Sequence, residues 1–432
     1  MSRNPVLLLL LAGPALSALA CPALAPQAAA ALTPAAVAER VPLCHPDVLA
    51  AERALGGAAA DVVTAGQRPN PTLGLGAGNL GRNMGAGSLW NKAFDHQVRV
   101  DQLVERGGKP RLRVATAQAQ RDAATADVFE ARRQATAATL RTFHDLAAAL
   151  ARREELAASV ALNDSSLQAF EQRVKSGDAA PLDATRFRLD ALRVQADLVQ
   201  ADTDARTLRQ QLALALGAPE QAQAIVPRAQ APAQPAAPQP VPLERLPAVA
   251  AAQSRLAAAQ QALALALARA QATRDVGVGV QLDRYPVTST NSSGTGNTVS
   301  VFVSVPLLFN HAYEGEIGRA QADVDSAAQA LERARAEAQD EATRALAQWQ
   351  AAQSRRRLVS DELLPAAQRV AQGAELSYQR GASGVLDVLD ARRSLRAAQI
   401  ERINAEAEAA KALVDLQAVS QAAAMANGSV LP

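Results

Sequence analysis

The sequence predicts a fold of long α-helices combined with membrane β-strands, in which one strand–strand–long helix–turn–helix unit occurs twice. Three observations lead to this prediction: an internal repeat, two long stretches rich in alanine and charged residues, and two windows in which apolar and polar residues alternate. Apolar types make up 49% of the 432 residues, but aromatic residues only 3%. Alanine suits helices that pack closely side by side better than it suits a thick globular core.

The internal repeat has a shift of about 204 residues. The segment KSGDAAPLDATR of the first copy corresponds to QRGASGVLDVLD of the second, so that Leu182 matches Leu386. A glycine stands five places earlier in each copy, at Gly177 and Gly381. Glycine at a break in the helical pattern indicates a tight turn, here between a long helix and its return helix.

The two copies, a linker and two ends make up the whole chain. Residues 1–20 form a signal peptide, and residues 425–432 a short tail. Repeat 1 covers 45–217, with an N-terminal helix, strands 71–79 and 93–104, and helices 109–176 and 182–216. Repeat 2 covers 244–424, with helices 244–272, 314–380 and 386–420, and strands 274–285 and 297–309. A Pro/Ala-rich equatorial linker at 218–243 joins them, since prolines at this density exclude helix.

The expected helices have matched lengths. At 1.5 Å per residue the helix 109–176 would measure ~100 Å, and its counterpart 314–380 is interrupted only by Pro365. The return helix 182–216 is about half as long, and the helix 244–272 can continue it end to end. The N-terminal helix can complete the return helix of repeat 2 in the same way. Columns of equal length suit a cylinder of helices.

Alternating residues mark the strand windows. Val276, Val278 and Val280 alternate with glycines. From Val299 to Val305, valines likewise occupy every second position. This period of two gives each strand one apolar and one polar face. The edge of a soluble sandwich would show the same pattern. The signal peptide and the lack of another apolar run of ~20 residues favour lipid on one face and water on the other.

The strand windows are too short to close a sheet within one chain. Four strands cannot form a barrel, for which about eight are the usual minimum, whereas three chains would supply twelve strands and twelve helical columns. We therefore expect a trimeric, 12-stranded β-barrel that continues into a 12-helix α-barrel. Aromatic residues in or beside the windows indicate interface girdles, although β-propensity alone also explains them. They are Trp90, Phe94, Tyr285, Phe302, Phe309 and Tyr313.

The N-terminus has the features of a secretory signal peptide. An apolar run follows Arg3, and small residues follow the run. Cleavage after residue 20 would leave Cys21 as the first residue, and the segment ALAC loosely resembles a lipidation box with an unusual leucine. Cleavage nearer Ala31 is the alternative. With Cys44 as the only other cysteine, we expect no disulfide framework.

Several function classes find no support in the sequence. The net charge is +2 with both signs interspersed, which gives no footprint for nucleic acid. No catalytic constellation stands out, so we expect no enzyme, no cofactor and no metal. The G-x-G-x-x-G match at 76–81 is not followed by a helix, and the Cys44-His45 pair lacks further ligands.

Two motifs connect the sequence to a known family. They are QRPNPTL at 67–73, before the first strand, and ERGGK at 105–109, where the first long helix begins. With the duplication, they make the chain resemble the TolC family of outer-membrane efflux factors over nearly the whole mature chain. Within this family the chain looks most similar to the CzcC-like factors of cobalt–zinc–cadmium resistance.

The resemblance implies a homotrimer in the lipid of the outer membrane, with a β-barrel there and most of the chain in a periplasmic α-barrel. A periplasmic adaptor and an inner-membrane pump of the resistance-nodulation-division type would dock at its far end. The implied function is a passive exit duct, here for heavy-metal cations. A multidrug efflux or type I secretion duct is one alternative. A periplasmic coiled-coil adaptor without a pore is an alternative from another class.

The resemblance also places a ring of aspartates at the narrow entrance of the duct. The paired aspartates of the family fall on Asp387 and Asp390, with Asp183 in the matching turn of the first copy. Three chains would crowd these carboxylates together, which attracts cations. Acids also favour helix N-termini, so Asp183 and Asp387 could instead start their return helices, and the two roles are compatible.

Other residues of the turns follow from the same comparison. Tyr378 matches the gate tyrosine of the family, but Ser383 stands where some members have an arginine. Arg186 corresponds to Asp390 in the repeat, and we expect it to offer an alternative charge partner. The turns 176–182 and 380–386 are the expected adaptor-docking tips. Their marker residues are Gly177, Leu182, Gly381 and Leu386.

Overall fold

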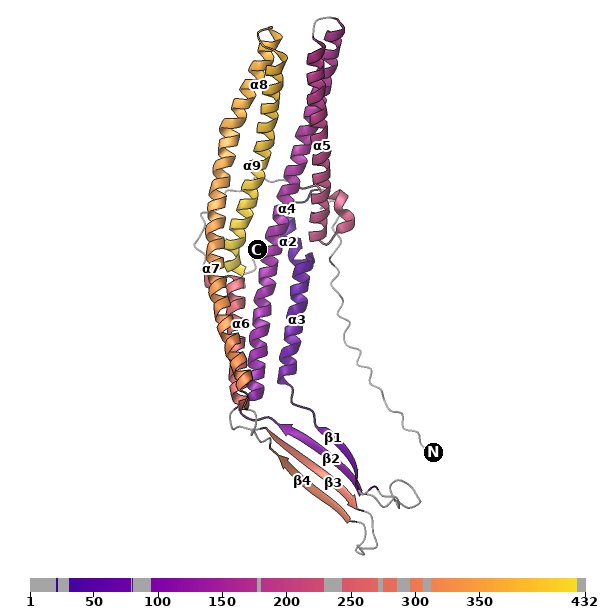
Figure 1. Ribbon diagram of the computed structural model, residues 1–432, viewed down its shortest axis with the longest axis vertical. Helices are drawn as coiled ribbons and strands as arrows, with labels where there is room; N and C mark the ends of the chain where they lie inside the picture. The colour runs from indigo at the N-terminus through magenta and orange to yellow at the C-terminus, as the bar shows by residue number, and fades with distance from the viewer. Residues whose placement is uncertain are drawn as a thin grey trace, which may run out of the picture. The chain divides into compact units, whose positions relative to one another are not determined.

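Long helices and one four-stranded sheet make up the computed structural model (Figure 1). It describes residues 21, 31–78, 80, 95–176, 180–228, 243–270, 275–285, 296–305 and 312–425. The described residues form two compact units, one drawn from 1–49, 132–237 and 346–418, the other from 50–131, 238–345 and 419–432. Outside the described residues lie the signal peptide, most of the linker, the tail beyond 425, Gly177, Trp90, Phe94 and Phe309.

The helices of the first half begin at residues that suit helix starts. Helix α2 (Pro34–Cys44) follows Thr33, whose hydroxyl accepts a hydrogen bond from the Ala36 N–H at 3.2 Å. This helix was not expected from the sequence. The next elements are α3 (Pro46–Gly66), α4 (Lys109–Lys175), α5 (Pro181–Ala215) and the 3-10 helix η2 (Pro219–Ala224). Proline at the first helical position costs no hydrogen bond, which explains three of these starts.

The second half contains one helical irregularity. Its elements are the 3-10 helix η3 (Leu243–Arg245), α6 (Pro247–Ala270), α7 (Glu314–Leu358), the π-helical turn η4 (Val359–Leu363), α8 (Leu364–Gln379) and α9 (Val385–Met425). The expected helix 314–380 is thus divided by a π turn, in which the Leu364 N–H donates to the Val359 carbonyl. The turn lies where Pro365 removes a helical donor. Helix α9 also runs five residues beyond its expected end.

The sheet lies entirely in the second unit. Its strands are β1 (Thr72–Gly78), β2 (Asp95–Val104), β3 (Val276–Tyr285) and β4 (Gly296–Ser304), antiparallel in the order β1-β2-β3-β4. The register places Val98 beside Leu282 and Leu282 beside Val299. These three side chains share one face and are 39%, 50% and 67% exposed. One face of the sheet is therefore an apolar surface that the described chain leaves uncovered.

The opposite face of the sheet is polar and closely packed. Arg99 binds Asp101 at 2.9 Å, and its guanidinium carbon lies 4.7 Å from the centre of the Phe302 ring. Asp101 leans over Gly279 of the neighbouring strand, where any Cβ would collide with the carboxylate. Gln281 donates to Asp283 at 2.8 Å. The glycines that alternate in the sequence thus make room for long polar side chains on the adjacent strands.

The core of the first unit ties the N-terminal segment to the long helices. Phe143 of α4, Leu212 of α5 and Val41 of α2 are fully buried together. Leu32 extends this contact, because its N–H donates to the Val226 carbonyl at 3.0 Å and its carbonyl accepts from the Arg228 N–H at 2.7 Å. The N-terminal segment is therefore packed against the region where α5 ends.

The helices of the second unit meet through small side chains. Val249 and Ala252 of α6 are buried against Leu331 and Ala338 of α7. Contacts between small side chains let the helix axes approach closely, so the core between the two helices is thin. Among the described helices, none contains a stretch long and apolar enough to cross a membrane.

Candidate functional site

The candidate site is built where the ends of α4 and α8 meet the starts of α5 and α9. Phe170 of α4 stacks on Phe187 of α5, with ring centres 4.1 Å apart, and lies 5.9 Å from the ring of Tyr378 in α8. Val385 and Leu389 of α9 complete this buried group. We call these five residues the turn cluster. It joins the helical hairpins of the two repeats.

Tyr378 also makes a polar contact across the hairpins. Its hydroxyl accepts a hydrogen bond from the Arg173 guanidinium at 3.0 Å. The same guanidinium lies 5.8 Å from the ring centres of both Phe170 and Tyr378, within reach of a cation–π interaction. The expected gate tyrosine is thus held by α4, through its ring and through its hydroxyl.

The two aspartates of the second turn lie on the exposed side of α9. Val388 and Leu389 are buried, whereas Asp387 and Asp390 are exposed. Asp387 accepts a hydrogen bond from the Gly384 N–H at 3.1 Å, so it stabilises the start of α9. The carboxylate therefore performs the helix-starting role and remains open to solvent.

Arg186 pairs with an aspartate of its own turn. Within this chain it binds Asp183 at 3.2 Å, three residues earlier in α5. Asp390 pairs instead with Arg393, at 3.4 Å. Each of these pairs joins residues one helical turn apart on a single helix. The role of Arg186 as an alternative charge partner at the gate stays a prediction.

The turns expose leucines that could receive a partner. Leu182 is 58% and Leu386 49% exposed, although both are large apolar residues. Gly381 has φ +73° and ends α8 in a Schellman motif, with its N–H bonded to the Tyr378 carbonyl and the Ala382 N–H bonded to the Ser377 carbonyl. This closure explains the glycine and fixes the direction in which the chain turns.

A buried carboxylate near the turns was missed by the sequence analysis. Asp190 of α5 is 2% exposed and accepts hydrogen bonds from Arg393 at 2.7 Å and Asn163 at 3.2 Å. Arg396 lies 3.6 Å from its second oxygen. The sequence contained a signal for this buried carboxylate, because Asp190 falls on the buried stripe of α5 that includes Phe187 and Val194. An acid on an apolar stripe requires a cationic partner.

A second charged contact joins the same hairpins. Arg392 of α9 binds Glu375 of α8 at 2.9 Å and donates to the Ser166 hydroxyl of α4 at 2.9 Å. Together with the Asp190 group, it connects the helices of both repeats through charged hydrogen bonds. Such bonds are specific in geometry and can exchange partners without breaking an apolar core.

A polar cavity of about 820 Å³ lies further along the first unit, between α4, α7 and α9. Lys411 at its edge binds Asp145 and Glu408, each at 2.8 Å. Burial alone would lower the pKa of Lys411, but the hydrogen bonds and the negative charges of Asp145 and Glu408 together outweigh it and raise the pKa above its ordinary value. Within the described part of the chain, no three His, Cys, Asp or Glu side chains gather as a metal site.

Cys21, the candidate lipidation site, is bonded through its sulfur to Cys44. A sulfur in a disulfide cannot carry a thioether-linked lipid. The structure therefore shows one disulfide, where the sequence analysis expected no framework and left the modification of Cys21 open.

Comparison with known proteins gives a consistent result. The family model described as outer membrane efflux protein matches residues 40–218 and 242–420, one segment in each repeat. No match is found among curated proteins. Among solved structures, the chain is similar to the outer membrane protein VceC from Vibrio cholerae, with 21% identity, a TM-score of 0.72, and coverage of 90% of this chain and 96% of that one.

Two further solved structures agree. CusC has 16% identity and a TM-score of 0.72, with 90% of this chain and 92% of that chain covered. The MtrE outer membrane channel of Neisseria gonorrhoeae has 17% identity and a TM-score of 0.67, with 89% and 87% covered. At these identities the likeness shows the fold, which confirms the fold class expected from the sequence.

Proposed function

The chain belongs to the outer membrane efflux protein family, and on this premise we propose that it is the passive exit duct of a tripartite efflux system. Three chains form the duct. An inner-membrane pump of the resistance-nodulation-division type supplies the energy, and a periplasmic adaptor connects pump and duct. The chain itself contributes a closed water path and a gate.

The sheet is the observation that carries this proposal. Its apolar face is fully formed yet uncovered, with Leu75 exposed by 75% and Val301 by 69%. Lipid can cover such a face, and water in a pore can solvate the opposite face with Arg99 and Asp101. Four strands per chain then require three chains for a closed twelve-stranded barrel.

The helical turns supply the gate in this proposal. Asp387 and Asp390 of three chains form the narrow entrance, and the exposed leucines Leu182 and Leu386 receive the adaptor. Tyr378 and the Asp190 group hold the hairpins together in the resting state. Opening requires that these charged contacts exchange partners, which an adaptor can induce by binding the turns.

We propose heavy-metal cations as the substrate class. The motifs QRPNPTL and ERGGK support this assignment. The polar face of the sheet adds a physical reason, because its described charged residues are three acids and one base: Asp95, Asp101, Asp283 and Arg99. A pore wall with an excess of carboxylates favours cations.

A matched pair of tryptophan variants tests the membrane assignment. Val301→Trp places a fluorophore on the apolar face and Ser300→Trp places one on the polar face of the same strand. In vesicles that contain brominated lipid, we expect strong quenching for Val301→Trp and little for Ser300→Trp. Equal, weak quenching of both would refute membrane insertion and favour the alternative of a periplasmic coiled-coil adaptor.

The substrate class needs a separate test. A host that lacks its own duct is given this chain together with a resistance-nodulation-division pump and its adaptor. Tolerance to cobalt, zinc and cadmium should rise, while tolerance to organic drugs should not. Drug tolerance without metal tolerance would favour a multidrug duct, and export of a protein would favour a type I secretion duct.

A further inference from the structure

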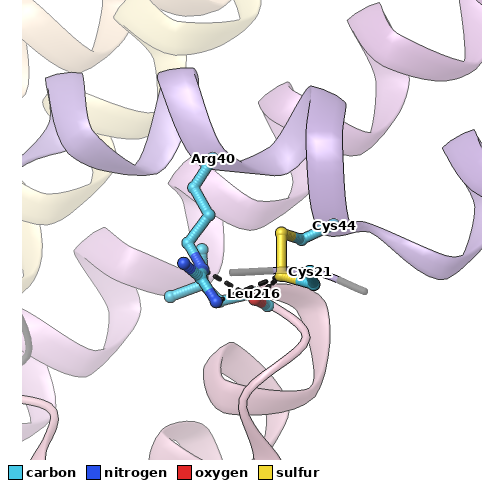
Figure 2. Close-up of a disulfide and its surroundings, with 4 residues drawn as sticks. All are labelled: Cys21, Arg40, Cys44 and Leu216. Carbon is cyan, nitrogen blue, oxygen red and sulfur yellow. Dashed lines mark hydrogen bonds between the residues drawn. A yellow bond between two sulfur atoms is a disulfide. The ribbon is translucent and has the colours of Figure 1, made fainter. Parts of the chain in front are cut away.

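A disulfide joins the first described residue of the chain to the end of helix α2. The Cα atoms of Cys21 and Cys44 lie 5.2 Å apart, across 23 positions of sequence. This separation is within the ordinary range of a disulfide. Figure 2 shows the bond beside the end of α5, next to Arg40 and Leu216.

The end of α5 is shaped to fit this disulfide. Helix α5 closes in a Schellman motif at Gly217, which has φ +65°. A Cβ on Gly217 would lie 3.2 Å from the Cys21 sulfur, and 3.2 Å from both the Cβ and the carbonyl oxygen of Cys44. The glycine therefore serves two purposes, since it permits the turn and lets both cysteines approach the backbone.

Arg40 completes the enclosure of the sulfur atoms. Its Nε donates to the Leu216 carbonyl at 2.8 Å, and its Nη2 lies 3.1 Å from the Cys21 sulfur. A cation at the C-terminus of α5 complements the helix dipole. Figure 2 shows Arg40 and Cys21 directed at Leu216, with Cys44 bonded to Cys21 on the side away from Leu216. Three segments that are distant in sequence thus meet around one covalent bond.

We propose that the mature chain keeps Cys21 and closes it in a disulfide with Cys44, in place of an N-terminal lipid. Signal cleavage then lies before residue 21 and not near Ala31. The disulfide fastens the N-terminal segment across the end of α5. Membrane attachment is left to the sheet. This inference rests on the proposed function only for the compartment, because a periplasmic chain meets an oxidising environment.

The chemistry of the bond is a thiol–disulfide exchange. The two cysteine thiols lose two protons and two electrons as the sulfur–sulfur bond forms. A dithiol–disulfide oxidant of the periplasm takes up the electrons, and its own disulfide is reduced to two thiols. Lipidation would consume the same Cys21 sulfur in a thioether, so one chain can carry only one of the two modifications.

Mass spectrometry of the full chain tests the proposal. The protein is purified from membranes without reductant, free thiols are alkylated with iodoacetamide, and peptides are mapped. We expect a Cys21 peptide linked to the Cys44 peptide, and a mature N-terminus at or before residue 21. Four results would overturn the proposal: an acylated Cys21, a mature N-terminus beyond residue 21, both thiols alkylated, or a link between two chains on a non-reducing gel.

A variant provides the matched control. In Cys44→Ser the Cys21 peptide should carry the alkyl group, because its partner is gone. Dithiothreitol should lower the thermal unfolding midpoint of the wild type and leave that of Cys44→Ser unchanged; an equal response of both would contradict the structural role. Mass spectrometry reads the covalent state of the two cysteines independently of channel activity. A chain that has the disulfide but shows no conductance would therefore refute only the proposed function.

Discussion

At the scale of single residues, Asp190 shows how the chain places a charge inside a helical interface. The carboxylate is nearly inaccessible, yet two arginines and one amide of other helices surround it. A buried carboxylate with these partners is tolerated, but a lost partner leaves charge unpaired. The residue therefore fixes which faces of α4, α5 and α9 meet.

Replacement of Asp190 should destabilise the first unit. In Asp190→Ala the guanidinium groups of Arg393 and Arg396 lose their shared acceptor, and we expect a loss of about 3 kcal/mol. Asp183→Ala is the matched control, because Asp183 forms only a surface pair with Arg186 and its loss should cost about 0.5 kcal/mol. Thermal unfolding in detergent measures both. Equal shifts of the unfolding midpoint in the two variants would show that the ion pairs of Asp190 do not stabilise the first unit.

His144 should make the chain sensitive to mild acid. Burial lowers its pKa below the ordinary value of 6.5; Asp145 opposes this shift and Lys411 adds to it. Below pH 6.5, His144 is protonated in the unfolded chain, whereas in the folded chain it stays neutral until the pH reaches its lowered pKa. Acid therefore favours unfolding from pH 6.5 down to the lowered pKa, and the effect levels off below that.

A variant without the imidazole isolates this effect. Between pH 7.5 and pH 5.5, the unfolding midpoint of His144→Gln should fall less than that of the wild type. Circular dichroism at the two pH values provides the measurement. If both proteins lose the same amount, His144 does not contribute to the acid sensitivity.

At the scale of elements, the turns decide where each hairpin ends. Helices α5 and α8 both close in Schellman motifs, at Gly217 and Gly381, and both glycines have positive φ. Nothing lies within 4 Å of a Cβ built on Gly381, so only its backbone conformation opposes a side chain. A substitution at Gly381 therefore introduces backbone strain without a steric collision.

Two glycine variants of the same hairpin test this separation. Gly381→Ala should lower stability by about 1 kcal/mol, since alanine disfavours the left-handed region. Gly373→Ala should raise it by about 0.5–1 kcal/mol, because Gly373 lies within α8 with open space around it. Chemical denaturation compares the two. A gain in both variants would mean that the turn at Gly381 rearranges freely.

The sequence was informative about elements and much less so about their partners. Proline, glycine and residue spacing act locally, so the turn at Gly381 and the alternation of the strands could be predicted. Helix α2 was missed because its alanine-rich sequence resembles the small residues that follow a signal peptide. The π turn depends on how α7 and α8 accommodate Pro365, which spacing alone does not reveal.

Contacts between distant segments could not be predicted at all. The disulfide needs Cys21 and Cys44 to meet beside Gly217, and the partner of Asp190 lies about 200 residues away. Arg186 and Asp390 correspond to each other in the repeat, and each binds a neighbour on its own helix, which the repeat alone did not reveal. An ion pair one helical turn apart is favoured because it orders fewer groups than a pair between separate helices.

In the whole molecule, three chains would complete one another. The described residues of one chain leave the apolar face of the sheet uncovered, and their four strands are too few for a closed wall. The same three-fold arrangement would bring Asp387 and Asp390 of each chain to one narrow entrance. The sheet and the turns together therefore predict a continuous water path through three chains, with an entrance at the turns that prefers cations.

Single-channel recording in planar bilayers is the most direct test of the trimeric duct. Wild-type protein should give discrete conductance steps with a preference for cations. Asp387→Asn/Asp390→Asn should still conduct, but with a clearly weaker preference, because the carboxylates that attract cations are neutralised. Folded protein that inserts into the bilayer and yet carries no current would contradict the duct itself.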